Sequence, residues 1–323
     1  MRHSLSSLVW RAAILSVFAV SAISWAEESP VCTVIIHPGE SIQAAIDQAP
    51  DGTVICLAEG EWAEHVTIGK SITLRGEGAG RSVIQATDTD QHVVVIRKEQ
   101  GDGADQRVLE VSVEGMAVAG LYGYRVGILV SSGTEVEIAG CTITRCGSGI
   151  AVEGEAQVTV SDCVISENQA SPDPGFYGDG DGIGLSGNAQ ATITNCTILG
   201  NGNQGAVLWE TSVAEISGCV IRGSRFGVVL HDSSRARIEQ TQILENLHYG
   251  VCLFEGPCFS PESAQGTRFT GYMAGRENTI PGPDEQYGNG TNRTLCPLYE
   301  GAVCPADLSF LMTEAGGELD RRD

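Results

Sequence analysis

A repeat of about 22 residues is the feature that most constrains this chain. The tetrapeptides Gly-Cys-Thr-Ile, Asp-Cys-Val-Ile, Asn-Cys-Thr-Ile and Gly-Cys-Val-Ile begin at positions 140, 162, 195 and 218. A fifth copy at 240–243 carries Thr241 in place of the cysteine. Successive copies are 22 or 23 residues apart, except for one step of 33 that contains an insertion. Such a period predicts a solenoid, in which each unit buries its apolar residues only by stacking on its neighbours.

Each repeat contains three short apolar runs separated by turn residues. In one unit the runs are 191–194, 196–199 and 205–209, and Asn and Gly lie between them. Short runs rich in Val, Ile and Thr, bounded by Gly and Asn, indicate strands. Three strands in each coil predict an all-β fold, a right-handed parallel β-helix with three sheets.

Alternation along each strand predicts which side chains enter the coil. In the unit above, the side chains expected to point inward are those of Cys196, Ile198, Ala206 and Leu208, and those expected outward are Thr197, Leu199, Val207 and Trp209. The repeated cysteines then form an interior column, Cys141, Cys163, Cys196 and Cys219, continued by Met116 and Thr241. Metal binding or redox chemistry is one reading of this column. Buried structural thiols are the favoured reading, because stacked parallel side chains do not converge as a tetrahedral zinc site requires.

The two ends of the chain suggest its compartment. Residues 1–26 resemble a signal peptide: Arg2 and Arg11 precede an apolar run at 12–23, and Ser24-Trp25-Ala26 fits a cleavage site. We therefore expect a secreted, periplasmic or cell-surface protein with no membrane insertion after cleavage. Export permits disulfides, and the pairs predicted are Cys32–Cys56, Cys252–Cys258 and Cys296–Cys304.

An amphipathic segment precedes the repeats. Residues 41–49 place Ile42, Ala45, Ile46 and Ala49 on one helical face, and Pro-Asp-Gly at 50–52 ends the pattern. We predict an α-helix that caps the N-terminal end of the β-helix. The predicted organisation is a signal peptide at 1–26, the capped β-helix at 27–256, and a C-terminal coil or cover segment at 257–323 whose tail after Gly316 is disordered.

Several of these segments resemble a known family. The sequences Ser-Ile-Gln-Ala-Ala-Ile at 41–46, Gly-Thr-Val-Ile at 52–55, Gly-Glu-Trp at 60–62 and Ile-Thr-Leu-Arg-Gly at 72–76 resemble the start of pectin-lyase-like right-handed β-helix proteins. Residues 179–183 and 205–209 are similar to the carbohydrate-binding and sugar-hydrolase repeats of that family. The resemblance covers roughly 31–255 and implies polysaccharide lyases, glycoside hydrolases, carbohydrate esterases or non-catalytic members. The Gln-Ala-Asp, Asn-Thr-Asp and Gly-Asp-Asp signatures of the catalytic members are absent from the sequence.

Charge narrows the choice of partner. The chain contains 41 acidic and 19 basic residues, for a formal net charge of −22. Such a surface repels nucleic acid and anionic membranes, so we expect no nucleic-acid partner. It also repels acidic polysaccharides unless calcium bridges the charges.

A column on the outer face of the third sheet is the candidate carbohydrate site. The predicted substrate-binding residues are an aromatic strip and the carboxylates that follow it: Trp209, Glu210, His231, Asp232, Phe254 and Glu255. Aromatic faces offer apolar area to sugar rings, and carboxylates accept hydrogen bonds from hydroxyl groups. The alternative is that the C-terminal segment covers this strip, because apolar outer sheets usually have a cover.

The insertion at 169–181 is the candidate metal site. Asp173, Asp179 and Asp181 lie among glycines in a segment with loop composition, and carboxylate oxygens are calcium ligands. His65, His92 and Lys98 form a third group. They could supply the base of a lyase mechanism, or they could lie in a solvated turn with no role in catalysis.

Two functions remain open from the sequence. The first is an exported β-helix protein that binds polysaccharide and could process it. The alternative is a non-catalytic surface or scaffold protein that mediates protein interactions.

Overall fold

The computed structural model describes residues 31–98, 107–123, 125–170, 179–253, 269–282, 288–289 and 308–321. The predictions for the signal peptide, for Asp173, Phe254 and Glu255, and for Cys258, Cys296 and Cys304 concern residues outside these ranges. In the described part of the chain, no helix is long and apolar enough to cross a membrane.

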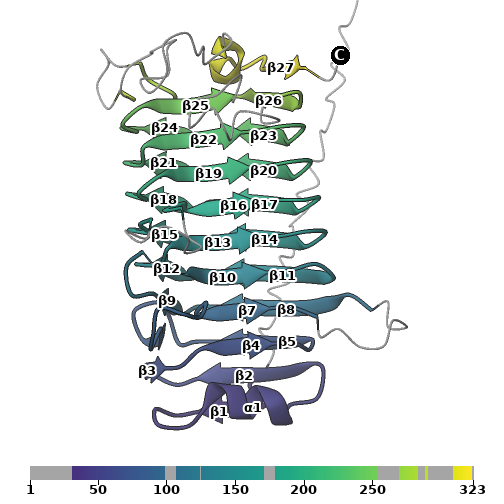
Figure 1. The fold of residues 1–323 in the computed structure, drawn as a ribbon, viewed down its shortest axis with the longest axis vertical. Helices are drawn as coiled ribbons and strands as arrows, with labels where there is room; N and C mark the ends of the chain where they lie inside the picture. Colours follow the sequence, from purple (N-terminus) through teal and green to yellow (C-terminus); the bar gives the residue numbers. More distant parts are fainter. Residues whose placement is uncertain are drawn as a thin grey trace, which may run out of the picture. The chain divides into compact units, whose positions relative to one another are not determined.

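The described strands form three sheets that wind into a parallel β-helix (Figure 1). The first sheet contains β1 (Val34–Ile36), β2 (Thr53–Leu57), β5 (Ile72–Arg75), β8 (Leu109–Glu114), β11 (Thr134–Ala139), β14 (Gln157–Ser161), β17 (Gln190–Thr194), β20 (Val213–Ser217), β23 (Arg235–Glu239), β26 (Tyr272–Arg276) and β27 (Gly317–Asp320). The second sheet contains β3 (Gly60–Ala63), β6 (Ser82–Gln85), β9 (Ala117–Ala119), β12 (Thr142–Thr144), β15 (Val164–Ser166), β18 (Thr197–Leu199), β21 (Val220–Arg222) and β24 (Gln242–Leu244). The third sheet contains β4 (Val66–Ile68), β7 (Val94–Ile96), β10 (Val126–Val130), β13 (Ser148–Val152), β16 (Ile183–Leu185), β19 (Gln204–Leu208), β22 (Phe226–Leu230) and β25 (Tyr249–Leu253).

The predicted inward and outward alternation is confirmed. Ile198 and Leu208 are fully buried inside the coil, whereas Thr197 and Leu199 are half-buried. Val207 points outward as predicted, but its side chain is buried, at only 1 % exposure.

The cysteine column is an interior hydrogen-bonded ladder. Its four thiols are 1 % exposed and make no disulfide. The Cys196 N–H donates to Cys219 Sγ over 3.4 Å, and the Cys219 thiol donates to the Ser217 carbonyl over 3.3 Å. Thr241 makes both types of bond with its hydroxyl, accepting the Cys219 N–H and donating to the Glu239 carbonyl. The column therefore selects small side chains that both donate and accept, which explains why threonine replaces cysteine in the fifth copy.

The residue before each ladder position adopts a left-handed backbone conformation. Its φ is +60° at Gly140, +54° at Asp162, +54° at Asn195 and +63° at Gly218. Gly, Asn and Asp tolerate this conformation best, so the turn explains the residues that precede cysteine in the repeat.

A second interior column was not recognised in the sequence. Asn168 and Asn201 are joined by a 2.9 Å bond from Asn168 Nδ2 to Asn201 Oδ1, and Asn246 Nδ2 reaches Asn289 Oδ1 over the same distance. All four side chains are at most 4 % exposed. Ser224 occupies the position between the two pairs, where its N–H donates to Asn246 Oδ1. The Asn that lies two residues after β15, β18 and β24 was the signal that could have revealed this column.

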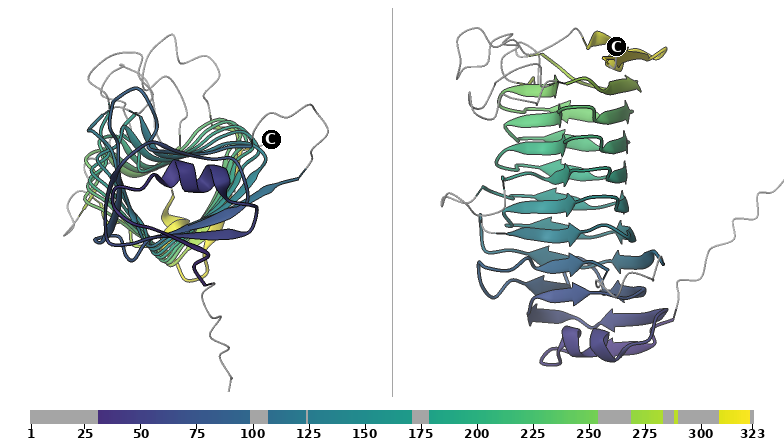
Figure 2. Two further views of the ribbon diagram at one scale, coloured as in Figure 1. Left: turned by 90° about the horizontal axis from the view of Figure 1, so that it is seen from below. Right: turned by 45° about the vertical axis from the view of Figure 1, so that its right-hand side comes forward.

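The predicted cap helix is confirmed as α1 (Ile42–Gln48), which lies across the N-terminal end of the coil (Figure 2). Ser41 Oγ accepts the Ala44 N–H, and the Glu64 carboxylate accepts the N–H groups of Ile42 and Gln43. These bonds satisfy three of the amides that a helix start leaves without partners. The predicted Cys32–Cys56 disulfide is also confirmed and joins the segment before β1 to β2.

The C-terminal end continues the coil and differs from the prediction in its tail. Within the segment predicted as coil or cover, β26 extends the first sheet and Thr279 pairs with Gln242 of β24. Residues 317–320, predicted to be disordered, form β27, which pairs antiparallel with β26. The turn of 3-10 helix η1 (Ser309–Met312) inserts Leu311 into the core at 0 % exposure. The tail is ordered because it supplies partners to the last strand edge, which would otherwise be unpaired.

Candidate functional site on the third sheet

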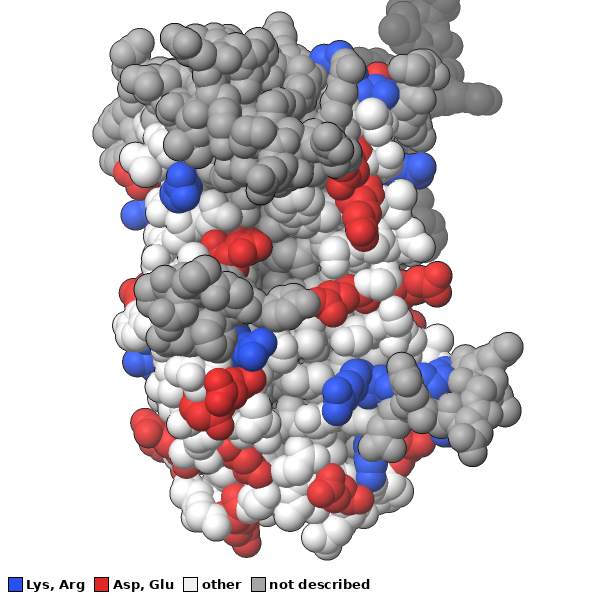
Figure 3. Space-filling model, viewed as in Figure 1, with Lys and Arg blue, Asp and Glu red and all other residues white. Residues whose placement is uncertain are grey.

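The outer face of the third sheet presents a column of uncharged side chains. The strand register aligns, from β4 to β25, Thr67, Val95, Leu129, Ala151, Gly184, Val207, Val229 and Cys252. Figure 3 shows uncharged surface in the lower part of this face, with charged side chains to either side of it. Aligned strands thus hold an apolar surface between polar borders.

This column is exposed at one end and buried at the other. The five positions from Thr67 to Gly184 are half-buried. Val207 and Val229 are 1 % exposed and pack with Tyr249 and Cys252, against which Trp209 and Phe226 also pack. The expectation that an apolar outer sheet is covered therefore applies to the part from β19 onwards. Of the segment predicted to supply the cover, 257–323, the first part at 257–268 lies outside the described residues.

Trp209 and His231 stack on each other at the border of the buried part. Their ring centroids are 3.5 Å apart and the planes differ by 9°. The two residues follow β19 and β22, so the parallel register places one ring directly on the next. His231 is fully buried, whereas Trp209 is half-buried. Burial lowers the pKa of His231 to about 3, so its ring is neutral at physiological pH.

The burial of His231 divides the predicted aromatic strip. Only the Trp209 indole retains substantial exposure among the strip residues that the structure describes. On the side of Trp209 away from His231 lies β16 with Gly184, followed by Ser186. The next strand, β13, contains Ala151 and is followed by Glu153. The indole thus borders a stretch of small side chains, with the exposed Glu153 carboxylate beyond them.

The two described carboxylates of the predicted site support the coil turns. Glu210 and Asp232 have left-handed backbones, with φ of +59° and +51°. The Gly187 N–H donates to Glu210 Oε2, and the Glu210 N–H donates to Asp232 Oδ2 over 3.0 Å. Each carboxylate therefore binds the turn of the preceding coil with one oxygen. Their predicted role in substrate binding stays a prediction.

Asp181 is the most perturbed carboxyl group of the third-sheet face. It is 6 % exposed, and its Oδ1 accepts the Gln204 N–H over 3.1 Å. Burial, with the nearby charge of Asp179, raises the pKa of Asp181 to about 7. Ser148 and Gln204 lie beside it in the same outward column and are also buried. A carboxyl with such a pKa exchanges its proton near neutral pH, which is the property that general acids and bases require.

Calcium binding at the insertion stays a prediction. The described residues supply only two of the three predicted ligands, the exposed Asp179 and the buried Asp181. Calcium takes six to eight oxygen ligands. Within the described residues, no three His, Cys, Asp or Glu side chains are grouped so that they could hold a metal ion.

The histidine and lysine group contributes to turns. His65 Nδ1 lies 2.9 Å from the His92 carbonyl, and His92 Nδ1 accepts the Val126 N–H over 3.1 Å. Burial lowers the pKa of His92, and Arg125 and His65 lower it further. Lys98 Nζ donates to the Arg107 carbonyl over 2.6 Å. These bonds favour the structural interpretation of the group.

Comparison with known proteins agrees with the fold. A family model described as "Right handed beta helix region" matches residues 126–271. No curated protein sequence matches the chain significantly. Among solved structures, pectin methylesterase from carrot aligns with a TM-score of 0.54 at 16% identity, over 82% of this chain and 88% of that one. Pectin methylesterase PemA from Erwinia chrysanthemi aligns with a TM-score of 0.52 at 13% identity, over 84% of this chain and 96% of that one.

At these identities the structural likeness establishes the fold, and the activity of each neighbour belongs to that neighbour. The three sheets, the family-model match over 126–271 and the likeness to the two pectin methylesterase structures together show that the chain has a right-handed parallel β-helix fold.

Proposed function

We propose that the chain is an exported protein that binds polysaccharide on the outer face of its third sheet, with the Trp209 indole as the stacking platform. One observation carries the proposal: a half-buried indole is fixed from one side by His231 and borders small side chains on the other. A sugar ring that stacks on an aromatic face needs an immobile ring and free space beside it. The structural neighbours named as pectin methylesterases support polysaccharide as the ligand class.

The charges beside the platform favour a neutral polysaccharide. Glu153 and Glu210 are exposed and Asp232 is half-buried. These carboxylates follow the strands β13, β19 and β22, at the same end of the sheet as the Trp209 indole. Carboxylates accept hydrogen bonds from sugar hydroxyls but repel uronate groups. The net charge of −22 acts in the same direction.

The test is a binding panel of neutral and acidic polysaccharides, measured by affinity electrophoresis and by calorimetry with oligosaccharides. Trp209→Ala should weaken binding roughly tenfold or more, because central aromatic anchors carry most of the affinity of a site. Tyr122→Ala is the matched control, since Tyr122 is 56% exposed and lies before its strand, β10, whereas Trp209 lies after its strand, β19. Undiminished binding by the Trp209 variant would refute the site. A reducing-sugar assay on the same panel tests whether binding is accompanied by cleavage.

A second function, a non-catalytic scaffold for protein interactions, is favoured by the burial of His231 and of Val207 and Val229. A covered sheet presents little surface to a sugar. Failure of every polysaccharide on the panel, together with an intact fold, would favour this second function.

A further inference from the structure

The outer face of the first sheet has a charge pattern that changes along the coil. At one end it carries the exposed carboxylates of Glu110, Glu135 and Glu137, on β8 and β11. At the other end β23 carries the exposed guanidinium groups of Arg235 and Arg237. Between them, β14 presents Gln157 and Thr159 and β17 presents Gln190 and Thr192, all uncharged, whereas β20 presents Val213 and the exposed Glu215.

The strand register arranges these residues in straight columns. One column runs from Glu135 through Gln157, Gln190 and Val213 to Arg235. The neighbouring column runs from Glu137 through Thr159, Thr192 and Glu215 to Arg237. In both columns the acid and the arginine are four strands apart, and β17 lies midway between them.

We propose that this face joins two copies of the chain in an antiparallel dimer whose two-fold axis passes over β17, parallel to the strands. Such an axis reverses the order of the strands and keeps each residue at its own position along the strand. Glu135 then faces Arg235 of the second copy, and Glu137 faces Arg237 of the second copy. Gln190 and Thr192 face their own counterparts. A two-fold interface requires a patch that is complementary to itself, and this pattern meets the requirement.

The charges that would pair are available. Glu135, Glu137 and Arg235 have no ion-pair partner among the residues that the structure describes. Glu110 and Glu135 are direct neighbours across β8 and β11, so their like charges repel in the isolated molecule. Arg235 of the second copy, opposite Glu135, would offset this repulsion.

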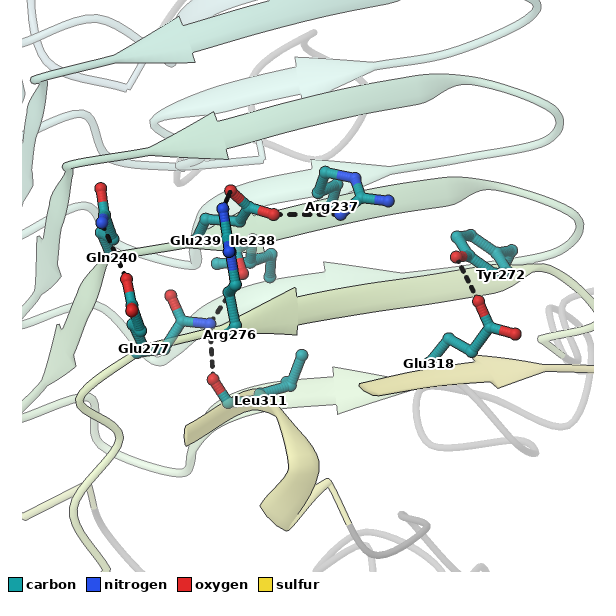
Figure 4. Close-up of polar contacts among 10 residues, drawn as sticks. Arg237, Ile238, Glu239, Gln240, Tyr272, Arg276, Glu277, Leu311 and Glu318 are labelled. Carbon is teal, nitrogen blue, oxygen red and sulfur yellow. Dashed lines mark hydrogen bonds and ion pairs between the residues drawn. The ribbon is translucent and has the colours of Figure 1, made fainter. Parts of the chain in front are cut away.

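Arg237 has a partner that it can exchange. Its guanidinium lies 3.0 Å from Glu239 on its own strand, and Glu239 also accepts from Arg276 (Figure 4). The Arg237 side chain is 52 % exposed, so water screens the existing pair. Glu239 keeps Arg276 when Arg237 turns towards the second copy.

The size of the face sets the strength of the association. Seven strands from β8 to β26, about 4.8 Å apart and about five residues long, bury on the order of 1,000 Å² in total when two copies meet. This area is at the lower limit for a specific interface. The dimer should therefore be weak, depend on concentration and dissociate in salt, which screens exposed ion pairs.

The experiment is sedimentation of the full chain over a concentration series, at about 20 mM and about 500 mM salt. We expect reversible dimers at low salt and monomers at high salt. The double variant Glu135→Arg/Glu137→Arg and the double variant Arg235→Glu/Arg237→Glu should each weaken self-association by roughly tenfold or more. An equimolar mixture of the two variants should restore the dimer, because each face is then opposite in charge to the other. The chain that carries all four substitutions should also dimerise.

Restoration by mixing separates lost complementarity from a folding defect, since a misfolded variant could not regain a partner. A wild-type chain that stays monomeric throughout the low-salt series overturns the proposal. Double variants that dimerise as the wild type does, or a mixture that stays monomeric, overturn it as well. Carbohydrate binding on the third sheet should be unchanged in every variant.

Discussion

At the scale of single residues, the interior columns explain the repeat. Cys196, Cys219 and Thr241 perform the same hydrogen-bonding role, so the cysteines of the ladder serve as small polar core residues. Hydrogen bonding to Cys141 and Cys196, together with burial, raises the pKa of Cys163, so this thiol stays protonated, and thiolates are the reactive and metal-binding form.

The interrupted asparagine column provides a stabilising substitution. Ser224 Oγ is buried without a hydrogen-bond partner in the described structure, between Asn201 and Asn246. Ser224→Asn should raise the free energy of unfolding by about 1 kcal/mol, because its amide can accept from Asn201 and donate to a carbonyl of the preceding coil, as Asn246 does. Urea denaturation measures the change. Ser224→Ala, which removes the unpaired hydroxyl without adding an amide, is the control and should change the stability less.

Asp181 makes stability depend on pH. Its folded-state pKa of about 7 exceeds the ordinary value of 3.8, so the folded chain binds a proton that the unfolded chain releases between these values. Its contribution is therefore most favourable below about pH 4 and is lost as the pH rises to about 7. Asp181→Asn should flatten the pH dependence of urea unfolding between pH 5 and 8. It should stabilise the chain at pH 8 by a few kcal/mol, on the order of the pKa shift. An equally steep profile in the variant would contradict this assignment.

At the scale of elements, one corner of each coil requires glycine. A Cβ at Gly205, in β19, would lie 2.4 Å from Ile221 Cγ2 and 2.7 Å from the Gly227 carbonyl oxygen. Gly205→Ala should lower the free energy of unfolding by about 2 to 4 kcal/mol through overpacking. Gly80→Ala is the matched control, because a Cβ there meets no atom within 4 Å, and its effect should stay within about 1 kcal/mol. Thermal unfolding of both variants makes the comparison.

The elements also show what the sequence could predict. The repeat that contains Cys196 and Ile198 was enough to predict the strand order, the register and the inward face. In a stacked coil, residues at the same position of successive repeats have the same surroundings, so the sequence pattern shows directly which of them are buried. The cap helix followed from the apolar positions on one face of 41–49 and from the Pro-Asp-Gly at 50–52 that ends the pattern; the Ser41 capping bond was found only in the structure. β27 could not be predicted, because its polar sequence carries no strand pattern and its order depends on pairing with β26. The burial of His231 could not be predicted either, because local sequence does not show what packs on the outer face of a sheet.

At the scale of the whole molecule, the described coil separates two surfaces. The third sheet carries the apolar column and Trp209, and the first sheet carries the self-complementary charges. Because the two faces belong to different sheets, ligand binding and self-association can be altered independently. A rigid stack of parallel strands suits both, since it holds long columns of side chains at constant spacing.

The most direct test of the carbohydrate site is a fluorescence titration of residues 27–323, which lack Trp10 and Trp25, with the buried Trp62 replaced by Phe so that Trp209 is the remaining tryptophan. Neutral oligosaccharide that binds by calorimetry should change the emission of Trp209 with the same midpoint, because the sugar replaces water at the indole. Adding Trp209→Ala should abolish that signal and weaken the binding. Oligosaccharide that binds with full affinity while the Trp209 emission stays constant would contradict the account.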